Sequence, residues 1–97
     1  MDASTIELSQ TVSQNQGQVS AEIDGEIVLM NLKMGNYYGL DDISSYIWRF
    51  LKEPVQVSKL CEVLASRYNA SPDTIEHDVL AHLQQMQAYG LIDVASE

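Results

Sequence analysis

Basic side chains are scarce in this chain: it has 5 Lys and Arg against 14 Asp and Glu, and its formal net charge is −9. A surface that lies along nucleic acid or anionic lipid is basic, so this composition argues against both partners. Long apolar runs are also missing: the longest aliphatic run covers only residues 27–30, and no basic or apolar segment opens the chain. We therefore expect neither a membrane span nor a signal peptide, and a cytoplasmic protein.

Reactive and metal-binding side chains are few as well. Cys61 is the single cysteine, so no internal disulfide can form, and its place on a predicted helix stripe suits a small apolar core residue. His77 and His82 are five residues apart, about 140° around a helix, so they cannot share a metal ion. One of Asp41 and Asp42 is needed as a helix cap, and neither has an evident catalytic partner. We expect a non-catalytic protein without metal or other cofactor.

The chain length of 97 residues suits one domain with a single modest core. Residues 1–17 are rich in Ser, Thr, Gln and Asn, with only scattered apolar positions. We expect them to form a flexible polar arm with at most one weak extended segment. The domain itself is expected over residues 18–94.

Two strands are predicted from alternation of side chains. In residues 26–32 both alternating faces are largely apolar, which is typical of a strand in the middle of a small sheet. Over residues 18–24, Val19, Ala21 and Ile23 alternate with polar neighbours. This second pattern predicts a half-buried strand with one face in water.

Glycines mark the turns that connect these strands. Asp24 and Gly25 predict a two-residue hairpin, and Gly35 supplies the positive φ for the next reversal. A third, shorter strand is predicted over residues 36–40, and Gly39 inside it suggests that another backbone comes close. The result is a three-stranded antiparallel meander whose first and third strands are its edges.

Three helices are predicted after the meander. Asp41 or Asp42 caps the first, which runs through Leu51 with Trp48 on its apolar face. The second covers about residues 58–68, with the spacing of a buried stripe.

Ser71 and Pro72 open the third helix as N-cap and first helical residue, and it ends at Tyr89 with Gly90 as its C-terminal cap. Residues 91–94 form a short tail that we expect to pack back on the sheet.

This order of elements predicts an α+β fold similar to a winged helix-turn-helix. Such a fold suggests DNA binding by the third helix, but that helix contains Asp73, Glu76 and Asp78 and no Lys or Arg. Because Lys and Arg contacts to phosphates supply most of the affinity for DNA, we do not expect nucleic acid as the partner. An acidic winged-helix regulator that binds a protein or DNA remains the alternative.

Three short motifs resemble one known family. They are G-x-Y-Y-G-L-D at residues 35–41, I-W at 47–48 and Y-G-L-I at 89–92. Together they are similar to the PqqD-like proteins, particularly the small stand-alone members from lasso-peptide gene clusters, and the resemblance covers about residues 19–94. Asp41 departs from the family, which more often has asparagine there, although both residues cap helices.

The resemblance implies a recognition element for the leader of a ribosomally made precursor peptide. The leader would add itself as an antiparallel strand beside the third strand, in a groove walled by the third helix. The protein would present the leader to a separate enzyme, in the lasso case a leader peptidase of the cysteine-protease type. The macrocyclase or another modifying enzyme, such as a radical-based one, are further candidate partners.

Independently of the resemblance, the sequence pattern leaves the predicted third strand, residues 36–40, as an unpaired edge. An uncharged edge strand is an aggregation hazard unless it is short or used, and strand addition is one such use. Tyr37, Tyr38 and Met86 suit an adaptable groove, whereas Val79 and Leu83 equally fit a core stripe, and the remaining helix positions would lie at the rim. The candidate peptide-binding residues are Asn36, Tyr37, Tyr38, Gly39 and Leu40 of the strand and Asp78, Val79, His82, Leu83, Gln85 and Met86 of the helix.

Overall fold

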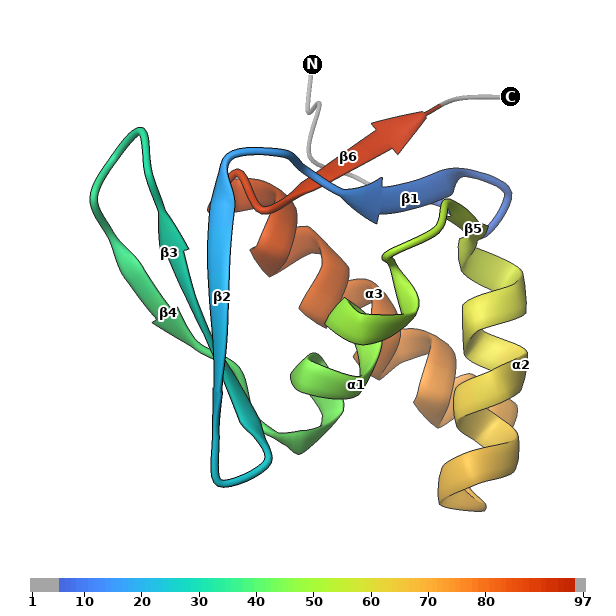
Figure 1. Cartoon of the computed structure of the whole chain (residues 1–97). Helices are drawn as coiled ribbons and strands as arrows, with labels where there is room; N and C mark the ends of the chain where they lie inside the picture. The colour runs from blue at the N-terminus through green and yellow to red at the C-terminus, as the bar shows by residue number, and fades with distance from the viewer. Residues whose placement is uncertain (1–5, 96–97) are drawn as a thin grey trace.

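The computed structural model describes residues 6–95, which form two small sheets and three helices (Figure 1). The elements are β1 (Thr11–Gln14), β2 (Gln18–Ile23), β3 (Glu26–Asn31), β4 (Tyr37–Gly39), α1 (Asp42–Phe50), β5 (Val55–Gln56), α2 (Val57–Tyr68), α3 (Pro72–Ala88) and β6 (Ile92–Ala95). The predicted α+β fold, a meander followed by three helices, is confirmed. Within the described residues, no helix is long and apolar enough to span a membrane.

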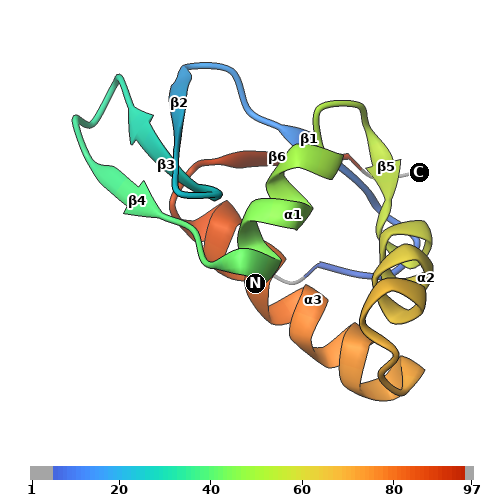
Figure 2. The same cartoon turned by 60° about the horizontal axis from the view of Figure 1, so that its bottom comes forward.

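The meander is the sheet β2-β3-β4, with β3 in the middle as predicted. Its first turn has Asp24 and Gly25 at positive φ, which suits a tight hairpin. Its second turn has Gly35 at a φ of 75° and is closed by the side chain of Asn31, which accepts hydrogen bonds from the backbone N–H groups of Lys33 and Met34. Both views place the meander at one side of the molecule and α2 at the other (Figures 1 and 2).

The predicted orientation of β2 is wrong. Ser20 lies opposite Leu29, and Leu29 is completely buried, so the polar face of β2 is on the same side as the core. Val19 and Ile23 lie on the other face and are 48% and 58% exposed. Five of the six residues of β2 are exposed, so burial does not select its apolar side. Its polar side instead makes contacts such as the ion pair of Glu22 with Arg49, at 3.2 Å.

Where the structure describes the predicted polar arm, the one extended segment that the sequence allowed is present, but it is not weak. Residues 11–14 form β1, the central strand of a second sheet with order β5-β1-β6, and Ile6 and Val12 are buried. This polar strand is held by backbone pairing on both sides and by side chains such as Gln14, whose Nε2 donates to the Trp48 carbonyl at 2.7 Å. The part of the prediction that concerns residues 1–5 falls outside the described residues.

The helix caps agree with the predictions. Asp41 accepts from the Ser44 N–H at the start of α1, and Ser71 accepts from the Thr74 N–H at the start of α3. Trp48 is buried in the common core, as its spacing predicted. The tail after α3 is strand β6, but it pairs with β1 rather than with the meander, because β1 provides the partner that the sequence did not reveal.

One buried hydroxyl attaches α1 to the meander. Ser45 is fully buried, its Oγ accepts a hydrogen bond from the Ile27 N–H at 3.0 Å, and it donates to the Leu40 carbonyl at 3.1 Å. The chain therefore leaves β4 and enters α1 at a fixed angle. This fixes the position of the β4 edge relative to the helices.

Candidate functional site

The outer edge of β4 presents unpaired backbone groups. Asn36 accepts from the Asn31 N–H at 2.9 Å, and the Leu40 N–H donates to Ile27 at 2.8 Å, so even-numbered residues of this segment face β3. Tyr38, opposite Leu29, belongs to the same set. Because backbone groups alternate along a strand, the N–H and C=O groups of Tyr37 and Gly39 point away from the sheet. They are available to another strand.

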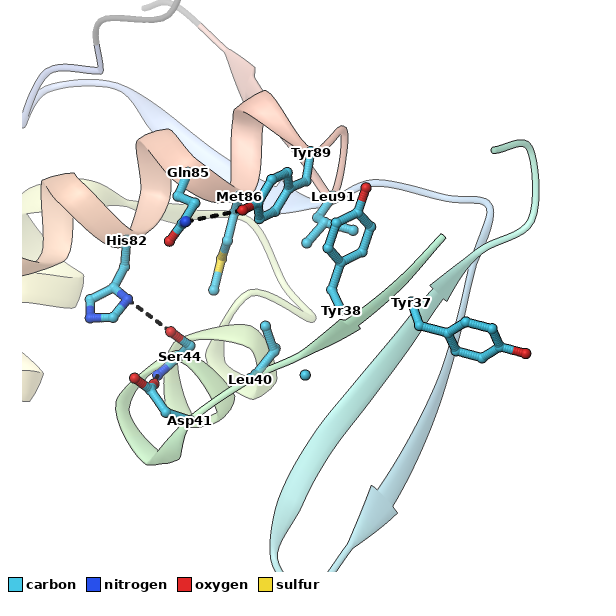
Figure 3. A pocket seen from close by; sticks show the side chains of 11 residues that line it. Tyr37, Tyr38, Leu40, Asp41, Ser44, His82, Gln85, Met86, Tyr89 and Leu91 are labelled. Carbon is cyan, nitrogen blue, oxygen red and sulfur yellow. Dashed lines mark hydrogen bonds between the residues drawn. The ribbon is translucent and has the colours of Figure 1, made fainter. Parts of the chain in front are cut away.

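A groove runs alongside this edge, between β4, the first turn of α1 and one face of α3 (Figure 3). Its floor is apolar, formed by the buried side chains of Leu40, Met86 and Leu91. Polar and aromatic groups stand at its two ends. The lining residues are Tyr37, Tyr38, Gly39, Leu40, Asp41, Ser44, His82, Gln85, Met86, Tyr89 and Leu91.

Two aromatic rings connect β4 to α3 at one end of the groove. Tyr38 and Tyr89 stack with ring centroids 4.5 Å apart and planes inclined by 21°. Asn36 Nδ2 donates to the Tyr38 hydroxyl at 3.3 Å, and Gln85 Nε2 donates to the Tyr89 hydroxyl at 3.1 Å. These amphipathic side chains offer both flat apolar faces and hydrogen-bonding atoms to a ligand.

The other end of the groove is polar. The hydrogen bond from the Ser44 N–H holds the pKa of the Asp41 carboxyl below its ordinary value, so this group is an anion at neutral pH. Ser44 Oγ and His82 Nδ1 are 2.8 Å apart, which joins α1 to α3. Within residues 6–95, no three His, Cys, Asp or Glu side chains are placed to hold a metal ion.

The lone cysteine lies away from this groove. Cys61 is buried in α2, and burial, followed by the neighbouring Glu76 carboxylate, raises the pKa of its thiol to about 11. At neutral pH this thiol is protonated, and a protonated thiol is a poor nucleophile.

The structure brings most of the predicted residues together. Leu40, Tyr38, His82, Gln85 and Met86 line the groove, and Gly39 borders it. The others take different positions.

Tyr37 contributes backbone only, because its side chain is 72% exposed and points away from the groove (Figure 3). Asn36 touches the groove only through Tyr38, and it lines a second hollow on the far side of the Tyr38–Tyr89 stack. Val79 and Leu83 are buried core residues, and Asp78 is exposed and does not line the groove.

Sequence reasoning missed four lining residues: Asp41, Ser44, Tyr89 and Leu91. Helical spacing could have found Tyr89, since residues 82, 86 and 89 share one face of a helix. Asp41 and Ser44 could also have been found, because the predicted helix cap directly follows the edge strand and therefore places the first turn of that helix beside it. No periodic signal marks Leu91, which follows the helix end.

Gly39 is not explained by the internal packing of the chain. Its φ is not in the left-handed region, and a Cβ added to it would have no atom within 4 Å. A glycine inside a strand often marks the close approach of another backbone. Gly39 is two residues from Tyr37 and shares its orientation, so this free space lies on the outward face of the edge strand.

Comparisons with known proteins agree with this architecture. The structure is similar to "TbiB1 in Complex with the TbiA(beta) Leader Peptide", with 29% sequence identity, a TM-score of 0.79, and coverage of 88% of this chain and 99% of that one. A lasso peptide synthetase B1 complexed with the leader peptide is 21% identical, with a TM-score of 0.75 and coverage of 84% and 96%. A search of the curated proteins finds no match.

A third similar structure is the solution NMR structure of the PqqD truncation of Methylobacterium extorquens PqqCD, a stand-alone RiPP recognition element. It is 20% identical, with a TM-score of 0.76 and coverage of 93% and 97%. Residues 26–92 match the model of the family described as coenzyme PQQ synthesis protein D. This span covers more than half of the chain, including β3, β4 and all three helices. The chain therefore belongs to the PqqD family.

Proposed function

We propose that this protein is a non-catalytic adaptor that captures the leader of a ribosomally made precursor peptide, as an antiparallel strand added to β4. The observation that carries the proposal is the edge itself: the free backbone groups of Tyr37 and Gly39 border a groove with an apolar floor. The similar TbiB1 structure contains a leader peptide. Main-chain pairing would supply affinity, and the groove would supply specificity.

The groove would select alternate side chains of the leader. Every second side chain of an added strand points toward α3, so apolar leader residues would contact Leu40, Met86 and Leu91. A leader residue near the α1 end would meet Asp41 and His82. We therefore expect a polar or basic leader side chain at the α1 end of the groove. The candidate binding residues are Asn36, Tyr37, Tyr38, Gly39, Leu40, Asp41, Ser44, His82, Gln85, Met86, Tyr89 and Leu91.

The adaptor would act in the cytoplasm with a separate enzyme. We infer that this enzyme is a leader peptidase of the cysteine-protease type acting on a lasso-peptide precursor, with the macrocyclase as a second candidate. Cys61 is buried and does not line the groove, so the thiol of this chain is not placed to act on a bound leader.

Two proline variants at adjacent positions test the strand addition. Proline removes the backbone donor and fixes φ. Tyr38→Pro removes the N–H that faces Leu29, and we expect it to destabilise the fold by roughly 1 to 3 kcal/mol. Tyr37→Pro removes a donor that faces outward, and we expect a near-normal melting temperature with leader affinity about tenfold lower or worse.

The measurements are thermal melts and calorimetry with a synthetic peptide of the cognate precursor's leader. Tyr37→Ala and Tyr38→Ala are the controls, because they lose the ring but keep both backbone donors. If Tyr37→Pro stays folded and binds the leader as tightly as Tyr37→Ala, the leader does not pair with β4.

A further inference from the structure

A second hollow lies beyond the Tyr38–Tyr89 stack, between the link from β1 to β2, the β3–β4 turn and the C-terminal end of α3. Tyr38 and Tyr89 line both this hollow and the groove, so their stacked rings (Figure 3) separate the two spaces. The second hollow is the larger, with a volume of about 670 Å³ against about 360 Å³ for the groove. It therefore has room for a side chain of a ligand as well as for water.

Asn31 is buried beside the second hollow with a polar group unused. The residue is 8% exposed, and its Oδ1 accepts from the backbone N–H groups of Lys33 and Met34 at 3.0 and 2.9 Å. Its Nδ2 lies 3.9 Å from the position that a Cβ of Gly90 would take, and it donates no hydrogen bond within residues 6–95. Because buried polar groups normally have a partner, this donor indicates an acceptor from outside the chain.

Lys33 gives the second hollow a positive charge. It is the single charged residue in residues 27–40, and it forms no ion pair with any residue that the structure describes. No Asp or Glu among the described residues lines the hollow, although the chain has 14 of them. Lys33 and the Nδ2 of Asn31 both offer hydrogen-bond donors, which is the combination that suits a carboxylate.

An antiparallel leader would reach the second hollow after it has passed the groove. Such a strand starts beside Gly39 and ends beside Tyr37, because β4 itself runs from Tyr37 to Gly39, and its next residues come beside Asn36. Leu40 lines the groove and Asn36 lines the second hollow, four residues and about 13 Å away along an extended chain. A leader side chain in the second hollow would therefore follow the one beside Leu40 by about four positions.

The two ends of this path carry opposite charges. Asp41 lines the groove at the α1 end, and Lys33 lines the hollow beyond the stacked rings. A peptide with a basic side chain first and an acidic side chain later would match both charges in the antiparallel direction and neither in the reverse direction. Since like charges brought together disfavour the wrong arrangement, this pair of charges selects one direction of binding.

We propose that the second hollow is a specificity subsite that receives an acidic side chain of the precursor, about four residues after the leader side chain that occupies the groove. This inference rests on the proposed function and adds the class of side chain that the leader carries at that position. The carboxylate would accept hydrogen bonds from Lys33 Nζ and Asn31 Nδ2. Its binding would fix both the register and the direction of the added strand.

The test measures the binding of a fluorescently labelled synthetic peptide of the cognate precursor's leader to variants of the full-length protein. Asn31→Asp keeps the acceptor that closes the β3–β4 turn and replaces the free donor by a carboxylate oxygen. Lys33→Glu reverses the charge of the hollow. Lys52→Glu is the matched control, because it makes the same change in net charge at an exposed lysine that lines neither space.

We expect the leader affinity of Asn31→Asp and of Lys33→Glu to be about tenfold lower or worse, and that of Lys52→Glu to stay within about twofold of the wild type. Melting temperatures should be those of the wild type. If Asn31→Asp melts earlier, Lys33→Glu and variants of the leader decide the question.

Variants of the leader identify the side chain that enters the second hollow. Each Asp and Glu of the leader peptide is changed to Ala in turn, and one of these changes should weaken binding to the wild type about tenfold. The same peptide should bind Lys33→Glu no more weakly than the unchanged leader does, because the two changes remove one interaction.

The outcomes separate this inference from the proposed function. If the wild type does not bind the leader, the proposed function fails, and this inference with it. If the wild type binds the leader and Lys33→Glu binds it equally well, or no acidic leader residue is coupled to Lys33, the subsite is wrong and the proposed function stands. Equal weakening by Lys52→Glu would also overturn the subsite, because the effect would then come from net charge alone.

Discussion

At the scale of single residues, neighbours in β4 have opposite roles. Tyr38 turns its ring inward onto Tyr89 and its backbone toward β3, whereas Tyr37 turns its ring outward and its backbone toward the free edge. The sequence predicted that the two would differ in backbone pairing, because alternation requires it. It could not say which was which, since the register depends on the bond from Asn31 to Asn36 across the turn.

Trp48 provides a test of the core at this scale. It is 5% exposed and belongs to the buried cluster around α1 and β3. We expect Trp48→Ala to lower the free energy of unfolding by roughly 3 to 5 kcal/mol, because it leaves a large cavity. Urea denaturation followed by circular dichroism measures the change, and Tyr37→Ala, at an exposed aromatic, is the control. Equal effects of the two variants would contradict the assigned packing.

At the scale of elements, the elements predicted well are those with a strong local signal. Capping residues located α1 and α3 to within a residue or two, and glycine turns located both hairpins. The elements β1 and β5 have no such signal: they are short, largely polar, and formed by pairing between distant segments. The groove was partly predictable from the same local signals, because the sequence indicated the edge strand and one face of the third helix. The first turn of α1 was not included in the predicted site.

Substitutions of Val12 and Val19 test the two places where the predicted burial of a strand differs from the structure. From the sequence, Val12 belongs to a flexible arm and Val19 to a half-buried strand, whereas the structure leaves Val12 0% and Val19 48% exposed. We expect Val12→Ala to destabilise by roughly 1 to 3 kcal/mol. Val19→Ala should change stability by less than about 0.5 kcal/mol. Thermal and urea melts of the two variants decide between the assignments, and the reverse order would restore the sequence-based view.

At the scale of the whole molecule, the distribution of charge differs from the basic surface that DNA binding requires. The chain's five basic residues are dispersed over the β3–β4 turn, α1 and its C-terminal end, and α2. Several are already engaged: Arg49 pairs with Glu22, Lys59 lies 3.9 Å from Glu62, and Arg67 stacks over Tyr46 at 4.3 Å. They form no stripe along one face, and a shared fold does not transfer a function.

The last prediction concerns DNA. We expect no retardation of duplex DNA by the wild type at about 0.15 M salt, because α3 would bring the carboxylates of Asp73, Glu76 and Asp78 toward the phosphates. A variant with these three residues changed to Lys is the positive control, and it should bind duplex DNA weakly and lose that binding as salt is raised. Tight, strongly salt-dependent retardation by the wild type would favour the acidic winged-helix regulator, since affinity without basic residues on α3 requires a DNA-binding surface elsewhere. Failure of both proteins to bind would show that the geometry of α3, and not only its charge, is unsuited to the major groove.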